Sequence, residues 1–175
     1  MTKLAPFIAA STLWLCACTS IGQVPTSKIA TGTLHSANGA LAGTVLIVVA
    51  GDEVTINVTA IGLAKGSHGV HLHAVGTCDG PTFASAGGHL NPHAKQHGSA
   101  NPAGSHLGDL PNLTIDAYGA GTLTAKLNDG RTAVEAALFD ADGSALVIHA
   151  DSDDYKTDPS GNSGTRIACA VLKRG

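Results

Sequence analysis

The chain has 175 residues, of which 43% are apolar and only 3% aromatic, so it can form one domain whose core is built from Val, Ile, Leu and Ala. Its formal net charge is −3 and it contains no basic run, which argues against a nucleic acid as partner. Its 22 glycines indicate many turns between short elements.

Residues 1–17 are typical of a signal peptide for export. Lys3 supplies a positive start, and the apolar stretch that follows is shorter than the roughly 20 residues needed to span a bilayer. Leu15-Cys16-Ala17-Cys18 resembles the lipobox of bacterial lipoproteins, which implies cleavage before Cys18 and lipidation of that cysteine. An ordinary secretory peptide cleaved nearby is the alternative. Either reading predicts export, and the lipobox resemblance implies a protein anchored by lipid on the periplasmic side of a bacterial membrane.

Residues 18–28 are predicted to form a flexible tether, because Ser, Gly, Gln, Pro and Thr are frequent there. Residues 29–175 then form the folded domain. Loss of Lys3 with the signal peptide would leave a net charge of about −4.

Strand-like runs recur through the domain, separated by turn residues such as Asn38-Gly39 and Asp142-Gly143. Residues 54–59 alternate apolar and polar side chains, which is the period of a half-buried strand. No amphipathic helix of ten or more residues is evident. The pattern predicts an all-β fold, an antiparallel sandwich or barrel. Its expected strands are residues 29–34, 43–49, 54–60, 70–75, 113–117, 122–127, 133–139, 145–149 and 167–172.

Two long stretches, residues 76–112 and 150–166, interrupt this rhythm. Long irregular loops in a compact domain are usually functional. We therefore expect the chemistry of the protein to lie in and beside these two loops.

Eight of the nine histidines fall between positions 68 and 149. His71 and His73 are two residues apart on a predicted strand, so both imidazoles point to one face and can reach one metal ion. A solitary histidine is more often a surface or core residue than a ligand, but here seven candidate groups occur together. Imidazole suits copper and zinc, and zinc accepts one carboxylate among imidazoles. The candidate ligands are His71, His73, His89, His97, His106, Asp109 and His149.

Cys78 and Cys169 are the two cysteines outside the signal region. In an oxidising compartment they are expected to form a disulfide, and two buried free thiols are the alternative.

The sequence resembles the copper/zinc superoxide dismutases from about Ile29 to Leu172. The motifs that carry the resemblance occur in the order and spacing of that family. They are Gly69-Val70-His71-Leu72-His73, Ser85-Ala86-Gly87-Gly88-His89-Leu90-Asn91-Pro92, His97-Gly98, His106-Leu107-Gly108-Asp109-Leu110, Val147-Ile148-His149-Ala150 and Gly164-Thr165-Arg166-Ile167-Ala168-Cys169.

This resemblance implies a Greek-key antiparallel β-sandwich or flattened barrel of about eight strands with two long functional loops. It implies copper bound by His71, His73, His89 and His149, and zinc bound by His89, His97, His106 and Asp109. The shared His89 would bridge the two metals as an imidazolate.

Other residues take roles from the same resemblance. Arg166 would lie beside the copper and capture the anionic substrate, and Asp153 would link a copper histidine to a zinc histidine from the outer shell. Cys78 and Cys169 would form the disulfide that ties the first loop to the barrel. His68 would be structural. His35 and His93 match no ligand; we expect His35 to be exposed and His93 to be a bystander, with weak accessory metal binding as the alternative.

The implied activity is that of a superoxide dismutase, which converts two superoxide anions to dioxygen and hydrogen peroxide by redox cycling of copper. A non-catalytic copper-binding or copper-delivery protein of the same fold is the alternative. A zinc hydrolase is disfavoured because the only glutamates, Glu53 and Glu135, lie outside the ligand loops. The sequence leaves the oligomeric state open, a homodimer included.

Overall fold

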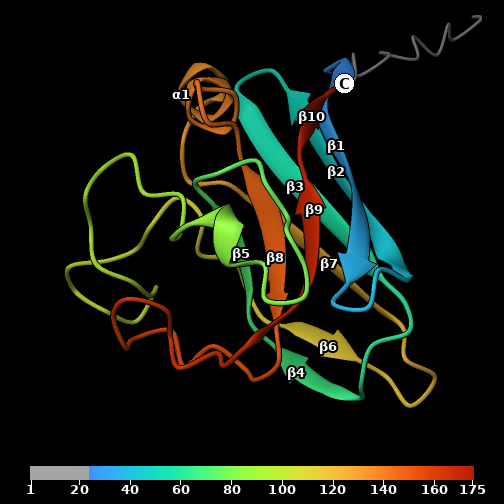
Figure 1. Ribbon diagram of the computed structural model, residues 1–175. Helices are drawn as coiled ribbons and strands as arrows, with labels where there is room; N and C mark the ends of the chain where they lie inside the picture. The colour runs from blue at the N-terminus through green and yellow to red at the C-terminus, as the bar shows by residue number, and fades with distance from the viewer. Residues whose placement is uncertain (1–23) are drawn as a thin grey trace, which may run out of the picture.

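A computed structural model describes residues 24–175 of the chain (Figure 1). The predicted signal peptide and the predicted lipidation site, Cys18, lie outside the described residues. Among the residues that are described, no helix has the length and apolarity required to cross a membrane. The first strand begins at Thr26, inside the stretch expected to be tether.

The domain is built almost entirely of strands, with one short α-helix and one 3₁₀ turn, η1 (Ala84–Ala86). The helix is α1 (Arg131–Leu138). The strands are β1 (Thr26–Ser36), β2 (Leu41–Ala50), β3 (Glu53–Ala60), β4 (Gly66–His68), β5 (Val70–His73), β6 (Leu113–Ile115), β7 (Gly121–Lys126), β8 (Ala145–His149), β9 (Arg166–Val171) and β10 (Lys173–Arg174).

Eight of these strands form one curled antiparallel sheet in the order β5-β8-β9-β1-β2-β3-β7, with β10 added beside β1. β4 and β6 pair separately and lie across one end of the curled sheet (Figure 1). Neighbours that are far apart in sequence, such as β3 with β7 and β5 with β8, require the long crossovers of a Greek-key arrangement. The predicted all-β antiparallel fold is confirmed.

The core lies inside the curve of the sheet. β3 shows the reason most clearly, since Val54, Ile56, Val58 and Ala60 are buried and alternate with polar residues. Because side chains alternate between the faces of a strand, one face of β3 packs into the core and the other meets solvent. The predicted period of two for residues 54–59 is therefore confirmed.

β5 and β8 depart from this alternation, because every residue in both strands is buried. Val70 and Leu72 belong to the core, so His71 and His73 must point to the opposite face. The two long loops cover that face (Figure 1), which shields the histidines from bulk water.

The strand predicted over residues 133–139 is wrong, since this stretch is the helix α1. Val134 and Leu138, four residues apart, are both buried and form the inner face of one helical turn. On the outer face Arg131 pairs with Glu135, again four residues apart. The Asp52 carboxylate accepts a hydrogen bond from the Arg131 backbone N–H at the start of the helix, which compensates for the lack of a side-chain cap.

Candidate metal centre

Two adjacent strands place three of the predicted ligands together. His71 and His73 come from β5, and His149 ends the neighbouring strand β8. His89 joins them from the first long loop, where an isolated bridge holds it opposite His73. One donor atom from each of these four histidines lies within 4.8 Å of the others.

Each of these four rings has one buried nitrogen without a hydrogen-bond partner. The four atoms are His71 Nδ1, His73 Nε2, His89 Nε2 and His149 Nε2. Buried polar atoms are nearly always satisfied, since an unsatisfied one costs roughly 1–3 kcal/mol. Four such atoms converging in one place indicate a site that is completed by a cation.

In three of these rings the opposite nitrogen is held by a hydrogen bond, which fixes the ring and its tautomer. His73 Nδ1 donates to the Gly87 carbonyl at 3.0 Å, and His149 Nδ1 donates to the Gly164 carbonyl at 3.2 Å. His71 Nε2 donates to Asp153 Oδ2 at 2.8 Å. In all three rings the unpartnered nitrogen is therefore the one that carries a free lone pair.

A second group of donors surrounds one oxygen of Asp109. Asp109 Oδ1 lies 3.0 Å from His89 Nδ1, 3.0 Å from His97 Nδ1 and 3.1 Å from His106 Nδ1. His89 Nδ1 and His106 Nδ1 are 3.4 Å apart. Four donors arranged tetrahedrally at about 2.0 Å from a zinc ion would be roughly 3.3 Å from one another, so this group fits a zinc site.

His71 also lies within 4.8 Å of His89, His97 and Asp109. We assign it to the first group, because its Nε2 is engaged by Asp153 and its Nδ1 is one of the four unpartnered nitrogens. His106 belongs to the second group by its direct contacts with Asp109 and His89.

His89 is common to both groups. Its Nε2 is one of the four unpartnered nitrogens, whereas its Nδ1 faces Asp109. The ring stacks on His71 with centroids 4.0 Å apart. One imidazole thus presents a nitrogen to each group, which is the geometry that the predicted bridge requires.

Asp153 connects the two groups from behind. Its Oδ2 accepts from His71 Nε2 and its Oδ1 accepts from His97 Nε2, at 2.8 and 3.0 Å. Gly161 packs directly on this link, and a Cβ there would collide with the Asp153 carboxylate and with the His97 ring. With a φ of +65°, this position needs glycine for its backbone as well.

Asn112, Tyr155 and Asp158 also position the site, and the sequence analysis did not single out these roles. The Asn112 side chain forms two hydrogen bonds with the Asp153 backbone. The backbone N–H of Asn112 donates to the Tyr155 hydroxyl. Asp158 Oδ1 accepts from the His97 backbone N–H at 2.6 Å. The only available signal was their position in the two long loops, and that does not reveal a partner more than 40 residues away.

Arg166 lies at the start of β9, at the edge of the histidine cluster. It donates to the carbonyls of Phe83 and Gly87, both at 2.6 Å. Arg166, His73 and His149 line the same open cleft of about 430 Å³. Burial lowers the pKa of Arg166 from its ordinary value, but an arginine remains charged at physiological pH. The cleft therefore has a fixed positive charge beside the unpartnered nitrogens.

The predicted disulfide between Cys78 and Cys169 is present. It closes a sequence separation of 91 residues, for which a loop-entropy model gives about 4–5 kcal/mol of stabilisation. Phe83 and Ala86 pack with Cys169 in a small second core, so the disulfide holds the segment whose carbonyls bind Arg166.

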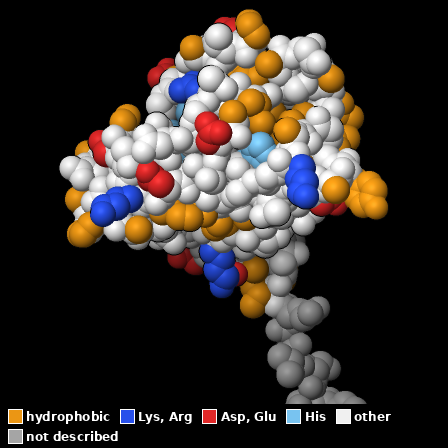
Figure 2. Space-filling view, turned by 90° about the horizontal axis from the view of Figure 1, so that it is seen from below, with side chains coloured by type: hydrophobic (Ala, Val, Ile, Leu, Met, Phe, Trp, Pro, Cys, Tyr) orange, Lys and Arg blue, Asp and Glu red, His pale blue; other side chains and the backbone are white. Residues whose placement is uncertain are grey.

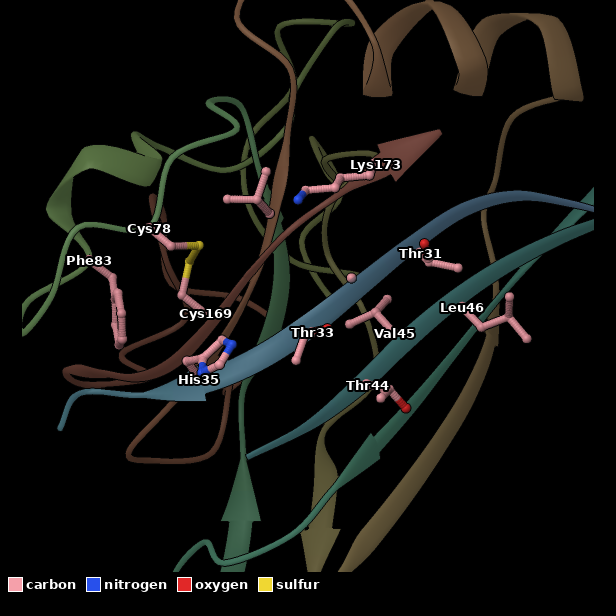
Figure 3. A pocket seen from close by; sticks show the side chains of 12 residues that line it. Thr31, Thr33, His35, Thr44, Val45, Leu46, Cys78, Phe83, Cys169 and Lys173 are labelled. Atoms are coloured by element: carbon pink, nitrogen blue, oxygen red, sulfur yellow. A yellow bond between two sulfur atoms is a disulfide. The ribbon is translucent and has the colours of Figure 1, made fainter. Parts of the chain in front are cut away.

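A larger hollow, of about 680 Å³, lies on the outer face of β1, β2 and β9 beside the disulfide (Figure 3). His35 is exposed there, as predicted, and its Nδ1 donates a hydrogen bond to the Gly39 carbonyl at 3.2 Å. Of the groups able to hold a metal among the described residues, none includes a residue of this hollow. Histidines of both donor groups line the smaller cleft instead.

The remaining two histidines have partners of their own. His68 is buried with its ring nitrogens bonded to the carbonyls of His149 and Ala64, which agrees with the predicted structural role. His93 Nε2 donates to Asp129 Oδ2 at 2.7 Å and belongs to no metal-holding group among residues 24–175.

Burial controls the protonation of the first group of histidines. It lowers the pKa of His73 to about 2, of His149 to about 3 and of His89 to about 4. These imidazoles are therefore neutral at physiological pH, as ligands must be. Burial acts on His97 in the same direction, but its bonds to Asp109 and Asp153 outweigh it and raise the pKa of His97 to about 9.

The two carboxylates behave in the opposite way. Burial alone would raise their pKa, but hydrogen bonds from His89 and His97 hold the pKa of Asp109 well below its usual range. Hydrogen bonds from His71 and His97 do the same for the pKa of Asp153. Both carboxylates are therefore anionic, and Asp109 among imidazoles makes a donor set that suits zinc.

The metal-free protein is expected to be most stable near pH 6.5 to 7. Below about pH 6.5 the unfolded chain protonates His73, His89 and His149 while the folded chain does not, so stability falls with acid. The raised pKa of His97 has the opposite effect on stability. The stabilisation from protonated His97 is complete below about pH 6.5 and is lost as the pH rises through about 9. Urea unfolding midpoints of chelator-treated protein measure this. A midpoint that rises from about pH 6.5 to 5 would contradict it.

Comparison with known proteins agrees with the geometry. The family model of copper/zinc superoxide dismutase (SODC) matches residues 41–172. A protein of Aquifex aeolicus named superoxide dismutase [Cu-Zn] 2 is 39% identical over 99% of this chain and its own entire length.

Solved structures give the same result. A SOD-like protein from Bacillus subtilis superposes with a TM-score of 0.77 at 38% identity, over 84% of this chain and 100% of its own. The Cu/Zn superoxide dismutase from Brucella abortus gives 0.67 at 29% identity, over 85% and 100%. The sequence, the fold and the paired histidine groups lead to one conclusion: the chain belongs to the copper/zinc superoxide dismutase family.

Proposed function

We propose that this protein is a superoxide dismutase that uses copper and zinc. The observation that carries the proposal is the convergence of four buried, unpartnered imidazole nitrogens beside Arg166 in an open cleft. The cleft suits a small anion, because it is lined by the fixed cation Arg166 and by no carboxylate.

The ligand assignment follows from the two groups of donors. His71, His73, His89 and His149 would hold copper, and His89, His97, His106 and Asp109 would hold zinc. Copper, when bound, exchanges single electrons with superoxide, whereas zinc has no redox chemistry and serves structure. The ring tautomers support this assignment. In His71, His73 and His149 the nitrogen opposite the proposed copper donor is hydrogen-bonded, and in His89 it is the proposed zinc donor.

Arg166 would attract and orient superoxide. Its guanidinium is fixed by the carbonyls of Phe83 and Gly87, so it does not need to be ordered when the anion arrives. Its remaining N–H groups can donate to the anion while the charge stabilises it.

His89 is the residue suited to supply a proton. Its Nε2 points into the cleft and has no protein partner. Its Nδ1 stays in contact with Asp109, which keeps the ring oriented whichever state Nε2 is in. Nε2 could hold a proton only when it is not bound to copper, and that proton would then lie at the cleft that Arg166 lines.

The acidic residues of the second long loop, within 151–158, do not line the cleft, and most of them are held by hydrogen bonds. Asp153 is buried and accepts hydrogen bonds from the His71 and His97 rings. Asp158 accepts one from the His97 backbone N–H. Asp154 accepts bonds from Lys156, Thr157 and Asn162 within the loop, and the Thr157 hydroxyl is the main cause that lowers the pKa of Asp154 to about 2. On the molecular face in Figure 2, acidic and basic side chains are scattered and neither sign dominates.

The test is an assay of superoxide loss by the purified protein with copper and zinc bound. We expect rapid loss of superoxide with dioxygen and hydrogen peroxide formed in equal amounts. Removal of the metals should abolish it, and copper added with zinc should restore it while zinc alone should not. A protein that binds both metals but leaves superoxide at the uncatalysed rate would instead favour the alternative, a non-catalytic copper-binding protein. The relatives named as superoxide dismutases do not favour that alternative.

Export to the periplasm with a lipid on Cys18 is the second part of the proposal. The Cys78–Cys169 disulfide supports export, because such bonds persist in oxidising compartments. The lipobox resemblance supports the anchor. Cys18→Ser should move the protein from the membrane fraction to the soluble periplasmic fraction while an activity assay stays unchanged. If wild-type and variant protein fractionate alike, the anchor is excluded.

A further inference from the structure

We propose that His93 is a positioning residue for the zinc site, acting on His106 through a turn that it pins to the barrel. The inference rests on the proposed assignment of His106 as a zinc ligand. His93 itself would not touch the metal. Its role follows from three linked contacts among residues of the first long loop and the connection between β7 and α1.

The first contact is the one that holds the ligand. His106 Nε2 donates to the Lys95 carbonyl at 3.1 Å, so the lone pair of the ring is on Nδ1. His106 Nδ1 is the atom that faces Asp109 and His89. The Lys95 carbonyl therefore sets both the tautomer and the direction of this ligand, as outer-shell partners of metal-bound histidines generally do.

The second contact closes the turn that carries this carbonyl. Asn91 Oδ1 accepts from the Lys95 N–H at 3.0 Å, and Asn91 Nδ2 donates to the Lys95 carbonyl at 2.8 Å. Ala94 completes the turn with a positive φ of 50°. Residues 91–95 thus form one small unit, and a shift of the unit moves the Lys95 carbonyl with it.

The third contact attaches this unit to the barrel. His93 projects from the turn and donates from Nε2 to Asp129 Oδ2 at 2.7 Å. Asp129 lies in the connection between β7 and α1, with 23% of its side chain exposed against 49% for His93. Within residues 24–175, this is the hydrogen bond that ties the 91–95 turn to that connection. His93, His106 and Asp129 line one small hollow, so the pin and the ligand are neighbours.

The turn would otherwise be free to rotate about its ends, because Pro92, His93, Ala94 and Lys95 are all exposed. Loss of the His93–Asp129 hydrogen bond should leave the fold intact but make the position of the Lys95 carbonyl less well defined. Zinc would then have to order the turn as it binds, which lowers its affinity.

The experiment measures zinc affinity by chelator competition in the full exported protein, together with the visible spectrum of cobalt(II) bound in place of zinc. We expect His93→Ala and Asp129→Ala each to weaken zinc binding about three- to tenfold. This is less than the 10- to 100-fold typical of a group bonded directly to a ligand, since His93 acts through the turn. The cobalt bands should shift or broaden in both variants, and the double variant should be no worse than either single one.

Two further variants separate positioning from general stability. His93→Gln keeps a donor for Asp129 and should recover most of the affinity. Arg174→Gln removes another exposed ion pair, between β10 and Glu135 of α1, and it should leave zinc affinity and the cobalt spectrum unchanged.

Unchanged zinc affinity and cobalt spectra in His93→Ala would overturn the inference while leaving the ligand assignment intact. If His93→Ala and Arg174→Gln weakened zinc binding equally, with an equal fall in metal-free stability, the inference would be overturned as well. A wild-type protein that binds no zinc at all would instead overturn the ligand assignment, and this inference with it.

Discussion

His149→Ala is expected to reduce superoxide dismutation by more than about 100-fold while zinc stays bound. His149 Nε2 is one of the four unpartnered nitrogens, so its loss removes a quarter of the proposed copper ligands. Substitution of outer-shell partners already costs 10- to 100-fold, and removal of a direct ligand should cost more. His149 makes no contact with Asp109, so the zinc group keeps all four of its donors. Metal content by mass spectrometry and the rate of superoxide loss measure the two effects.

The fold should survive this change, because the strand bonds of His149 come from its backbone. Its N–H donates to the Gly69 carbonyl, and its carbonyl accepts from His68. His35→Ala is the matched control, since it removes an exposed imidazole from the larger hollow, which shares no lining residue with the cleft. Full activity of His149→Ala with copper still bound at one equivalent would show that the ligand assignment is wrong.

The histidine pair on β5 could be predicted from sequence because its logic is local. Residues two apart on a strand share a face, so His71 and His73 point the same way. Val70, before them, and Leu72, between them, mark the other face as core. The family motifs then identified the remaining candidates, and the structure brings all seven together in two touching groups.

The helix α1 shows why the rest of the fold was harder to predict. Val134 and Leu138 alone fit a buried strand as well as one face of a helix, because eight residues give too few repeats to separate the two periods. The choice is made by partners elsewhere, such as Asp52, whose carboxylate and carbonyl both hold the Arg131 N–H. Tertiary contacts of this kind leave no trace in a local pattern.

The contacts of the second long loop could not be predicted for a related reason. As a sequence, residues 151–158 are an acidic run, and nothing in the run itself indicates which groups its carboxylates bond. In the fold Asp153 and Asp158 face histidines of the site, and Asp154 accepts hydrogen bonds within the loop. The acidic residues therefore organise the loop, and the charge that an incoming anion meets in the cleft is that of Arg166.

Arg166→Ala is expected to slow the reaction with superoxide tenfold or more, with copper and zinc both retained. The guanidinium contacts none of the proposed ligand nitrogens, since its bonds go to the Phe83 and Gly87 carbonyls. What the variant loses is the fixed charge of the cleft, and focused charge of this kind raises on-rates by 10- to 1,000-fold. The rate constant should also become less sensitive to ionic strength, because screening then has less attraction to weaken.

Two variants distinguish capture at the cleft from a change in overall charge. Lys65→Ala removes one exposed positive charge from the connection between β3 and β4 and should leave the rate almost unchanged. Arg166→Lys keeps the charge but cannot bond both carbonyls in the same fork, so its rate should fall between those of wild type and Arg166→Ala. If Arg166→Ala kept the wild-type rate constant and its dependence on salt, Arg166 would have no part in capturing the anion. If Lys65→Ala slowed the reaction equally, the net charge of the molecule, and not the geometry of the cleft, would govern the encounter.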